Sequence, residues 1–468
     1  MKKLLALLAV LGFVSYAHAG DGTEFSQSGE YRVQYQHDMN KDFDSKMGGG
    51  GDNAEMFHQR LRWGANWRVG EKMTAHLTMV HNANWGDNAS QVPNTVTTGA
   101  AAGSGVANTM TVQEAYGTWM ATDSVAIKYG RGSVTMADGR FISANSYENV
   151  NNAFDGVLVH WDHEMFKFGF FGVRAANSNL DAGTTNDNNV ARFYGVSADW
   201  KTAPDFLKTV HLHYVTVKAD EGDYAGAASS IPNEDSVRMG VAVAGDRMGI
   251  DYRANYEAYT GKRKTSAATA SGLTKQDISA SMMDAEVGYS MPSMMGMRVH
   301  AGYHTDTGSK VASSGTGAND QSKDQTYQGF FYDRHDNGGL MGLLSWGNLT
   351  YTTLGVSLNV RDDVSVAANY FMYEKTDAKD DNYNSTGKFV GNSFAGSNNV
   401  AIFNATAAGS DKELGNELDL VATKKYTNNF SITAHYAMFN AGKVVKDNSA
   451  NGKNDTETEY YLESRLTF

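Results

Sequence analysis

Residues 249–259 read Gly-Ile-Asp-Tyr-Arg-Ala-Asn-Tyr-Glu-Ala-Tyr, and the alternation within this stretch decides the fold. Apolar and polar residues take turns, which is the period of a β-strand whose two faces meet different surroundings. One face carries Ile250, Tyr252, Ala254, Tyr256 and Ala258, and the other carries Asp251, Arg253, Asn255 and Glu257. A face with so many charges needs water, whereas the apolar, aromatic face suits lipid.

The same unit repeats along the chain from Ser26 to the C-terminus. Runs of about ten alternating residues are separated by short turns and, in strict alternation with them, by long loops rich in Gly, Asn, Asp and Ser. Residues 70–72 form one of the short turns, and residues 307–347 form one of the long loops. The sequence therefore predicts an all-β fold, a transmembrane antiparallel up-and-down β-barrel with long extracellular loops and short periplasmic turns.

Counting the alternating runs predicts 18 strands. They are expected at 26–39, 56–69, 73–84, 110–120, 125–132, 153–163, 166–175, 189–200, 209–219, 235–244, 248–259, 278–290, 297–306, 348–360, 364–375, 414–424, 430–440 and 457–468. With an even number of antiparallel strands, both termini of the chain are expected on the periplasmic side.

The N-terminal residues have the pattern of an export signal. Two lysines follow Met1, an apolar run covers residues 4–14, and Ala17-His18-Ala19 matches a cleavage site. We expect residues 1–19 to be a signal peptide and residues 20–468 to be a single barrel domain in the outer membrane of a Gram-negative bacterium. The apolar run is too short to cross a membrane as a helix.

Composition excludes several other classes of protein. The chain has no cysteine, so it has neither a disulfide framework nor thiol chemistry, and its formal charge of −12 argues against nucleic acid as a partner. None of the common hydrolase, protease or nucleotide-binding motifs is present, so no catalytic residue and no cofactor is expected. His211 and His213 share a strand face and are candidates for a metal site, but without suitably spaced carboxylates they indicate polar residues of the lumen, and no metal is expected.

Aromatic residues support the membrane assignment. Trp67, Trp119, Trp161 and Trp200 each lie near the end of a strand that leads to a short turn, as expected for a girdle at the periplasmic interface. The last strand alternates up to a terminal Phe468, which resembles the signal that the barrel assembly machinery recognises. The expected partners are therefore outer-membrane lipid and lipopolysaccharide, the assembly machinery and a hydrophilic solute.

The polar strand faces predict a charged, water-filled lumen. By alternation, the lumen-facing residues include Arg60, Arg62, Glu114, Lys128, Arg253, Arg298 and Asp419. Opposite charges produce a field across the lumen that orients dipolar solutes, and patches rich in arginine favour anionic or hydroxyl-rich ones. The alternative is that these charges only solvate the wall and pair with one another.

The segment from Gly130 to Gly156 is a candidate pore constriction. The residues expected to form it are Arg131, Asp138, Arg140 and Asp155. The loop from Ser133 to Asn152 contains apolar residues at Phe141 and Ile142, so we expect it to fold into the pore, with the carboxylates fixing the guanidinium groups. The arginines either face passing ions or hold the loop to the wall, and a rigid loop is compatible with both.

The same segment resembles the alginate-export family of outer-membrane barrels. The resemblance lies in the order Gln113-Glu114-Ala115-Tyr116, Gly130-Arg131-Gly132, Ala137-Asp138-Gly139-Arg140, Asn149 and Phe154-Asp155-Gly156. It implies an 18-stranded channel for an anionic polysaccharide, with basic lumen residues and a constriction made by inward loops.

Taken together, these patterns predict a porin-like channel for the passive passage of small hydrophilic, anionic or sugar-type solutes. The alternatives are a structural or adhesive barrel and a barrel enzyme. The solute, the direction of transport, the ion selectivity and the oligomeric state are not determined by the sequence.

Overall fold

The fold is taken from a computed structural model of the chain. It describes residues 23–40, 54–85, 109–147, 151–175, 191–204, 206–219, 233–266, 273–308, 323–329, 331–333, 335–344, 346–378, 411–448 and 456–468. The predicted signal peptide, residues 1–19, and Asn149 lie outside these ranges.

Long antiparallel strands make up almost all of the described chain. They are β1 (Thr23–Met39), β2 (Ala54–Val69), β3 (Met73–Asn84), β4 (Thr109–Thr122), β5 (Val125–Gly132), β6 (Phe154–Asp162), β7 (Phe166–Ala175), β8 (Ala191–Trp200), β9 (Thr209–Ala219), β10 (Asn233–Arg247), β11 (Ile250–Ser266), β12 (Leu273–Met291), β13 (Met297–Asp306), β15 (Leu349–Arg361), β16 (Val364–Lys375), β17 (Glu413–Lys425), β18 (Phe430–Ala441) and β19 (Thr456–Thr467). Three short elements accompany them: a 3₁₀ turn (Ala137–Gly139), β14 (Lys323–Asp324) and α2 (Lys443–Asn448).

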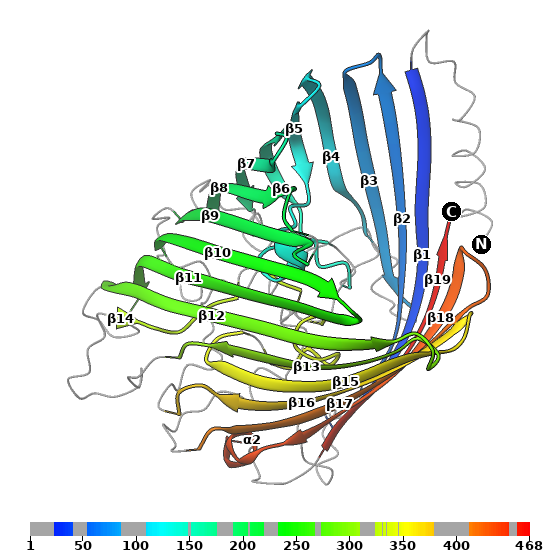
Figure 1. Ribbon diagram of the computed structural model, residues 1–468, viewed down its shortest axis with the longest axis vertical. Coiled ribbons are helices and arrows are strands. Elements are labelled where there is room, and N and C mark those ends of the chain that lie inside the picture. The colour runs from blue at the N-terminus through cyan, green and yellow to red at the C-terminus, as the bar shows by residue number, and fades with distance from the viewer. Residues whose placement is uncertain are drawn as a thin grey trace.

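The strands form one closed wall. Each strand pairs with its neighbours in chain order, and β1 pairs with both β2 and β19, so the described sheet has no free edge along that pairing. In Figure 1 the blue β1 lies beside the red β19, where the wall closes. Leaving aside the two-residue β14, the barrel has 18 antiparallel strands in the described part of the chain, which confirms the predicted fold class.

The two faces of the wall differ as the alternation predicts. Large apolar side chains such as Tyr256, Leu354 and Leu462 are exposed on the outer face, whereas Glu257 and Asn255 are buried on the inner one. Because neighbouring residues of a strand point to opposite faces, the outer belt needs lipid and the inner wall holds the charges. Among the described residues, no helix has the length and apolar character needed to cross a membrane.

The buried apolar core lies inside the barrel. The described parts of two long connections fold inward and pack on the inner wall. The first inward loop, residues 133–147 and 151–153, follows β5, and the second inward loop, residues 323–329, 331–333, 335–344 and 346–348, follows β13. Phe141 and Ile142 of the first and Tyr327 and Trp346 of the second belong to one buried cluster with inner-wall residues. The inward fold of the first loop agrees with the sequence prediction, and the inward fold of the second was not predicted.

Candidate functional site

The first inward loop is tied to opposite parts of the wall. Arg140 donates from Nε to Oδ1 of Asp284 on β12 at 2.7 Å, and Arg60 on β2 donates from Nη1 to the carbonyl oxygen of Ser146 at 3.0 Å. Arg62, also on β2, donates to Oδ1 of Asn151 at 2.6 Å. The loop therefore crosses the lumen, and a solute has to pass beside it.

Arg140 is enclosed by carboxylates. Its guanidinium is nearly buried, pairs with Asp284, and also donates to Oδ2 of Asp138 at 2.6 Å. Burial alone would lower the pKa of Arg140, but attraction by Asp284 and Asp138 outweighs it and holds the pKa above its usual value. Burial also raises the pKa of Asp138, against the opposing effect of Arg140. Since its charge is balanced on both sides, Arg140 acts mainly as an anchor for the loop.

Arg131 and Asp155 do not join this group. They are paired in register on β5 and β6, with Arg131 Nη2 at 2.7 Å from Asp155 Oδ2. Arg131 is three positions from Lys128, which lies on the inner face, and two positions from Tyr129, which is exposed on the outer face. Because side chains alternate along a strand, Arg131 lies on the same face as Tyr129. The pair thus lies on the outer face of the barrel. This placement corrects the expectation that Arg131 and Asp155 line the constriction beside Asp138 and Arg140.

The second inward loop covers carboxylates of the inner wall on β13 and β17. The backbone N–H groups of Leu340 and Met341 donate to Asp419 at 3.1 Å and to Glu417 at 2.9 Å on β17, and Gly347 donates to Asp306 on β13 at 2.9 Å. All three carboxylates are almost completely buried. Asp419 therefore supports a loop instead of facing open water, which corrects its assignment to the solvated wall.

Aromatic residues of the second inward loop hold it against the inner wall. Trp346 stacks on His304 of β13 and on Tyr332, with centroid distances of 4.3 and 4.2 Å. Tyr327 donates to Oε1 of Glu257 on β11 at 2.8 Å. The sequence signal for this inward fold is the group of aromatic residues between positions 327 and 346, which a solvated external loop would not need.

Arginines gather on β19, β1 and β2, and β18 separates β19 from β17. Arg32 on β1 is the direct cross-strand partner of Arg60 on β2 and of Arg465 on β19. Arg62 lies on the same inner face of β2 as Arg60. Glu30 pairs with Arg60, with Oε1 at 3.0 Å from Nε, and Glu463 is 2.9 Å from Nη2 of Arg465. We call Arg32, Arg60, Arg62 and Arg465 the arginine cluster.

Like charges directly opposite on neighbouring strands destabilise a sheet. In the arginine cluster, Glu30 lies next to Arg60 and Arg465, and Glu463 lies next to Arg465. Nε of Arg62 is buried and makes no hydrogen bond within the described part of the chain. Arg62 therefore keeps one donor without a partner among the described residues, whereas Arg32 and Arg60 are almost completely buried.

Arginines near the short turns extend the positive surface. Arg253 on β11 and Arg298 on β13 both pair with Glu286 of β12 at 2.7 Å. The two guanidinium groups are 33% and 27% exposed, against 12% for the glutamate. Arg465 is 43% exposed against 10% for Glu463. In these three pairs the cation is the more exposed partner, whereas in the second ion pair of Arg298 the carboxylate of Asp251 is more exposed, at 35%.

Glu114 and Lys128 complete the set of predicted lumen residues. Glu114 on β4 accepts hydrogen bonds from the backbone N–H of Ser133 at 2.8 Å and from its hydroxyl at 2.7 Å, so it holds the start of the first inward loop. Nζ of Lys128 lies 3.7 Å from the ring centre of Tyr116. Both residues belong to the inner wall, but only Glu114 contacts the loop directly.

His211 and His213 are engaged with separate carboxylates. His211 lies 2.6 Å from Asp199, and His213 lies 3.0 Å from Glu257. Within the described ranges, no group of three His, Cys, Asp or Glu side chains is arranged to hold a metal ion. Their positions agree with polar residues of the lumen.

Comparison with known proteins gives a match to a protein family. The model of the alginate export family matches residues 24–458, which is nearly the whole chain. No curated protein gave a significant match.

Solved structures show the same fold. OccD3 (OpdP) of Pseudomonas aeruginosa is 12% identical with a TM-score of 0.55, over 96% of this chain and 93% of that chain. OccK8 (OprE) of the same organism is 11% identical with a TM-score of 0.55, over 95% and 98%. The outer membrane protein OprD of Pseudomonas aeruginosa is 10% identical with a TM-score of 0.53, over 97% and 95%.

Proposed function

Because the chain belongs to the alginate export family, we propose that it is a passive outer-membrane channel whose lumen prefers anionic, hydroxyl-rich solutes such as carboxylated sugars. Its short turns then face the periplasm of a Gram-negative bacterium and its long loops face outward. In this proposal solutes pass through the lumen beside the inward loops, and no chemical step is part of the function.

The observation that supports the anion preference is the exposure of three guanidinium groups on the inner wall, while carboxylates elsewhere on that wall are covered by a loop. Buried carboxylates such as Glu417, Asp419 and Asp306 accept hydrogen bonds from backbone groups of the second inward loop. The guanidinium groups of Arg253, Arg298 and Arg465 remain a quarter to almost half exposed. Solutes in the lumen therefore meet these guanidinium groups, which bind carboxylates in a bidentate manner.

A planar-bilayer recording tests the proposal. Under a salt gradient, the wild-type channel should show a reversal potential on the anion-selective side, and R62Q/R465Q should shift it toward cations. K72Q/K201Q removes two cations at the short turns and should leave it nearly unchanged, because salt screens charges beyond about 10 Å at 0.1 M. Oligogalacturonate should block the wild-type current more strongly than that of R62Q/R465Q.

Two results would contradict the proposal in different ways. A folded protein that gives no conductance is not an open channel. A channel that conducts but whose selectivity and oligogalacturonate block are the same in R62Q/R465Q does not select anions through the arginine cluster.

A further inference from the structure

A row of charged side chains crosses the outer face of the barrel near the long-loop ends of seven neighbouring strands. Its members are Arg131 on β5, Asp155 on β6, Arg174 on β7, Arg192 on β8, Lys218 on β9, Asp235 on β10 and Lys262 on β11, and each is the direct cross-strand partner of the next. Five are basic and two are acidic. We call this set the outer charged row.

The centre of the row consists of cations alone. Arg174, Arg192 and Lys218 follow one another on adjacent strands, where directly opposed Cβ atoms are about 5 Å apart. Arg174 and Lys218 make no hydrogen bond or ion pair with any residue that the structure describes. Like charges on neighbouring strands destabilise a sheet, and an anion bound at Arg174 and Lys218 would offset this repulsion.

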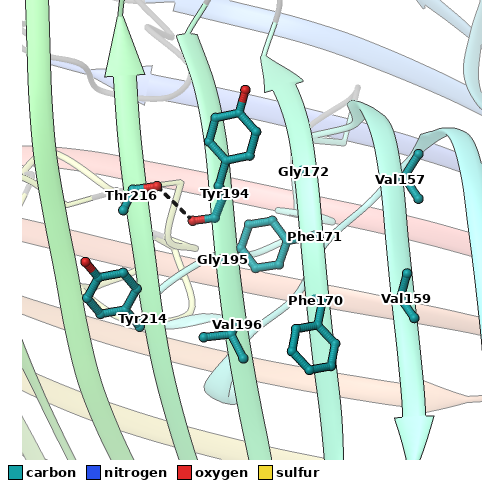
Figure 2. Close-up of a pocket in the computed structure, with 10 residues that line it drawn as sticks. All are labelled: Val157, Val159, Phe170, Phe171, Gly172, Tyr194, Gly195, Val196, Tyr214 and Thr216. Carbon is teal, nitrogen blue, oxygen red and sulfur yellow. Dashed lines mark hydrogen bonds between the residues drawn. The ribbon is translucent and has the colours of Figure 1, made fainter.

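The surface next to these cations is apolar. One position nearer the short turns on the same face, β7 has Gly172, β8 has Tyr194 and β9 has Thr216; beyond these come Phe170, Val196 and Tyr214. In Figure 2, Thr216 lies above Tyr214 on the ascending β9, so the long-loop ends are toward the top of the view. Tyrosine favours the interface between lipid and water, so the cations lie at headgroup level.

A groove of about 450 Å³ opens at this place on the outer face. Gly172 is flanked in register by Val157 on β6 and Tyr194 on β8, and its missing side chain leaves the depression between them (Figure 2). Phe170 and Tyr214 continue the apolar lining. The lining is mainly apolar, which suits a hydrocarbon chain, and Arg174 and Arg192 lie one same-face position beyond Gly172 and Tyr194 on β7 and β8.

We propose that this surface is a binding site for lipopolysaccharide, with a lipid A phosphate held by Arg174, Arg192 and Lys218 and an acyl chain lying in the groove at Gly172. Phosphate oxygens accept several charge-assisted hydrogen bonds at once, and guanidinium groups suit them geometrically. The long-loop end, the cationic centre and the adjoining groove together match a phosphorylated, multiply acylated lipid of the outer leaflet. The site is independent of the lumen and of the solute that passes through it.

The test measures binding of purified lipid A to the full-length folded protein in detergent by native mass spectrometry. R174Q/R192Q/K218Q should bind bisphosphorylated lipid A roughly tenfold more weakly than wild type, because charge-assisted contacts are lost. K72Q/K201Q/K208Q makes the same change in net charge at the short turns and should bind like wild type. G172L fills the groove without removing a charge and should also weaken binding.

A second readout separates a binding defect from a folding defect. Without lipid, R174Q/R192Q/K218Q should unfold at the same temperature as wild type or higher, since the repulsion is gone. Lipid A should raise the unfolding temperature of wild type and not that of the triple variant. Equal binding of dephosphorylated lipid A, equal binding of phosphatidylglycerol, or wild-type affinity in the triple variant would each overturn the proposal.

Discussion

Replacing Arg140 by glutamine should release the first inward loop from β12. The guanidinium is nearly buried and bridges Asp284 and Asp138, so its removal leaves Asp284 with a buried charge. Removing one partner of a buried ion pair costs about 3–5 kcal/mol. Asp284 keeps His304 as a second partner, with Nδ1 at 3.5 Å from Oδ2, so we expect the lower end of that range.

A loss of about 3 kcal/mol shifts an equilibrium by roughly two powers of ten. If most of this free energy is lost from the docking of the first inward loop, the loop should be detached in a measurable fraction of R140Q molecules. Single-channel recordings should then show a larger mean conductance and more frequent transitions than wild type. R140Q/D284N removes the unpaired carboxylate and should be less destabilised than R140Q, measured by thermal unfolding of the folded barrel.

R131Q is the matched control, because Arg131 lies on the outer face and touches no part of the lumen. It should leave conductance and selectivity unchanged. The anchor interpretation would be refuted if R140Q conducted like wild type but changed its ion selectivity, because Arg140 would then act on passing ions. Equal destabilisation by R140Q and R140Q/D284N would show that the pair with Asp284 does not hold the loop.

Three further predictions concern the wall. Leu462 is 48% exposed on the lipid face, so Leu462→Arg should destabilise the barrel by about 2–4 kcal/mol in reversible unfolding in lipid. Thr433→Arg, on the inner face opposite Glu463, should cost less than about 1 kcal/mol. Equal costs of the two changes would mean that the strand register is wrong. Deleting Phe468 removes two backbone hydrogen bonds to Gly29, at 2.7 and 3.0 Å, and should lower the amount of heat-modifiable protein in outer-membrane fractions. A wild-type amount would show that closure of the barrel does not depend on this residue. Asp363 has a pKa of about 2 because Arg361 and Lys424 donate to it, so its stabilisation is present above the unfolded pKa of about 3.9 and is lost as the pH falls through about 2. The difference in unfolding temperature between wild type and D363N should be constant above pH 5, shrink as the pH falls from there and vanish below pH 2. A difference at pH 2 as large as that at pH 5 would contradict this origin.

Strand positions could be predicted because each strand separates water from lipid. β7, β9, β13 and β16 begin and end at the predicted residues. β11 instead runs on to Ser266, beyond the predicted end at residue 259. Past the membrane both faces of a strand meet water, so the alternation disappears while the backbone pairing continues. The sequence has no signal there to mark the end of the strand.

The candidate site was predicted in part. The inward fold of the first loop follows from apolar residues such as Phe141 in an otherwise polar connection, and Arg140 is inside as expected. Arg131 was assigned by its proximity in the sequence to Arg140, although it is three positions from Lys128 on the same strand and so belongs to the other face. Strict use of the two-residue period would have placed it correctly.

The net charge of a chain is a poor guide to what its channel prefers. This chain has a formal charge of −12, which alone suggests that anions are repelled. Many of its inner carboxylates, however, are bound by the inward loops: Asp419 and Glu417 by backbone N–H groups of the second loop, and Asp284 by Arg140 of the first. A charge that is buried and paired acts weakly on a passing ion, whereas an exposed guanidinium such as that of Arg465 acts directly. If the channel prefers anions as proposed, the sign that remains exposed after the loops have docked decides the selectivity, and the loops are then part of the selectivity filter.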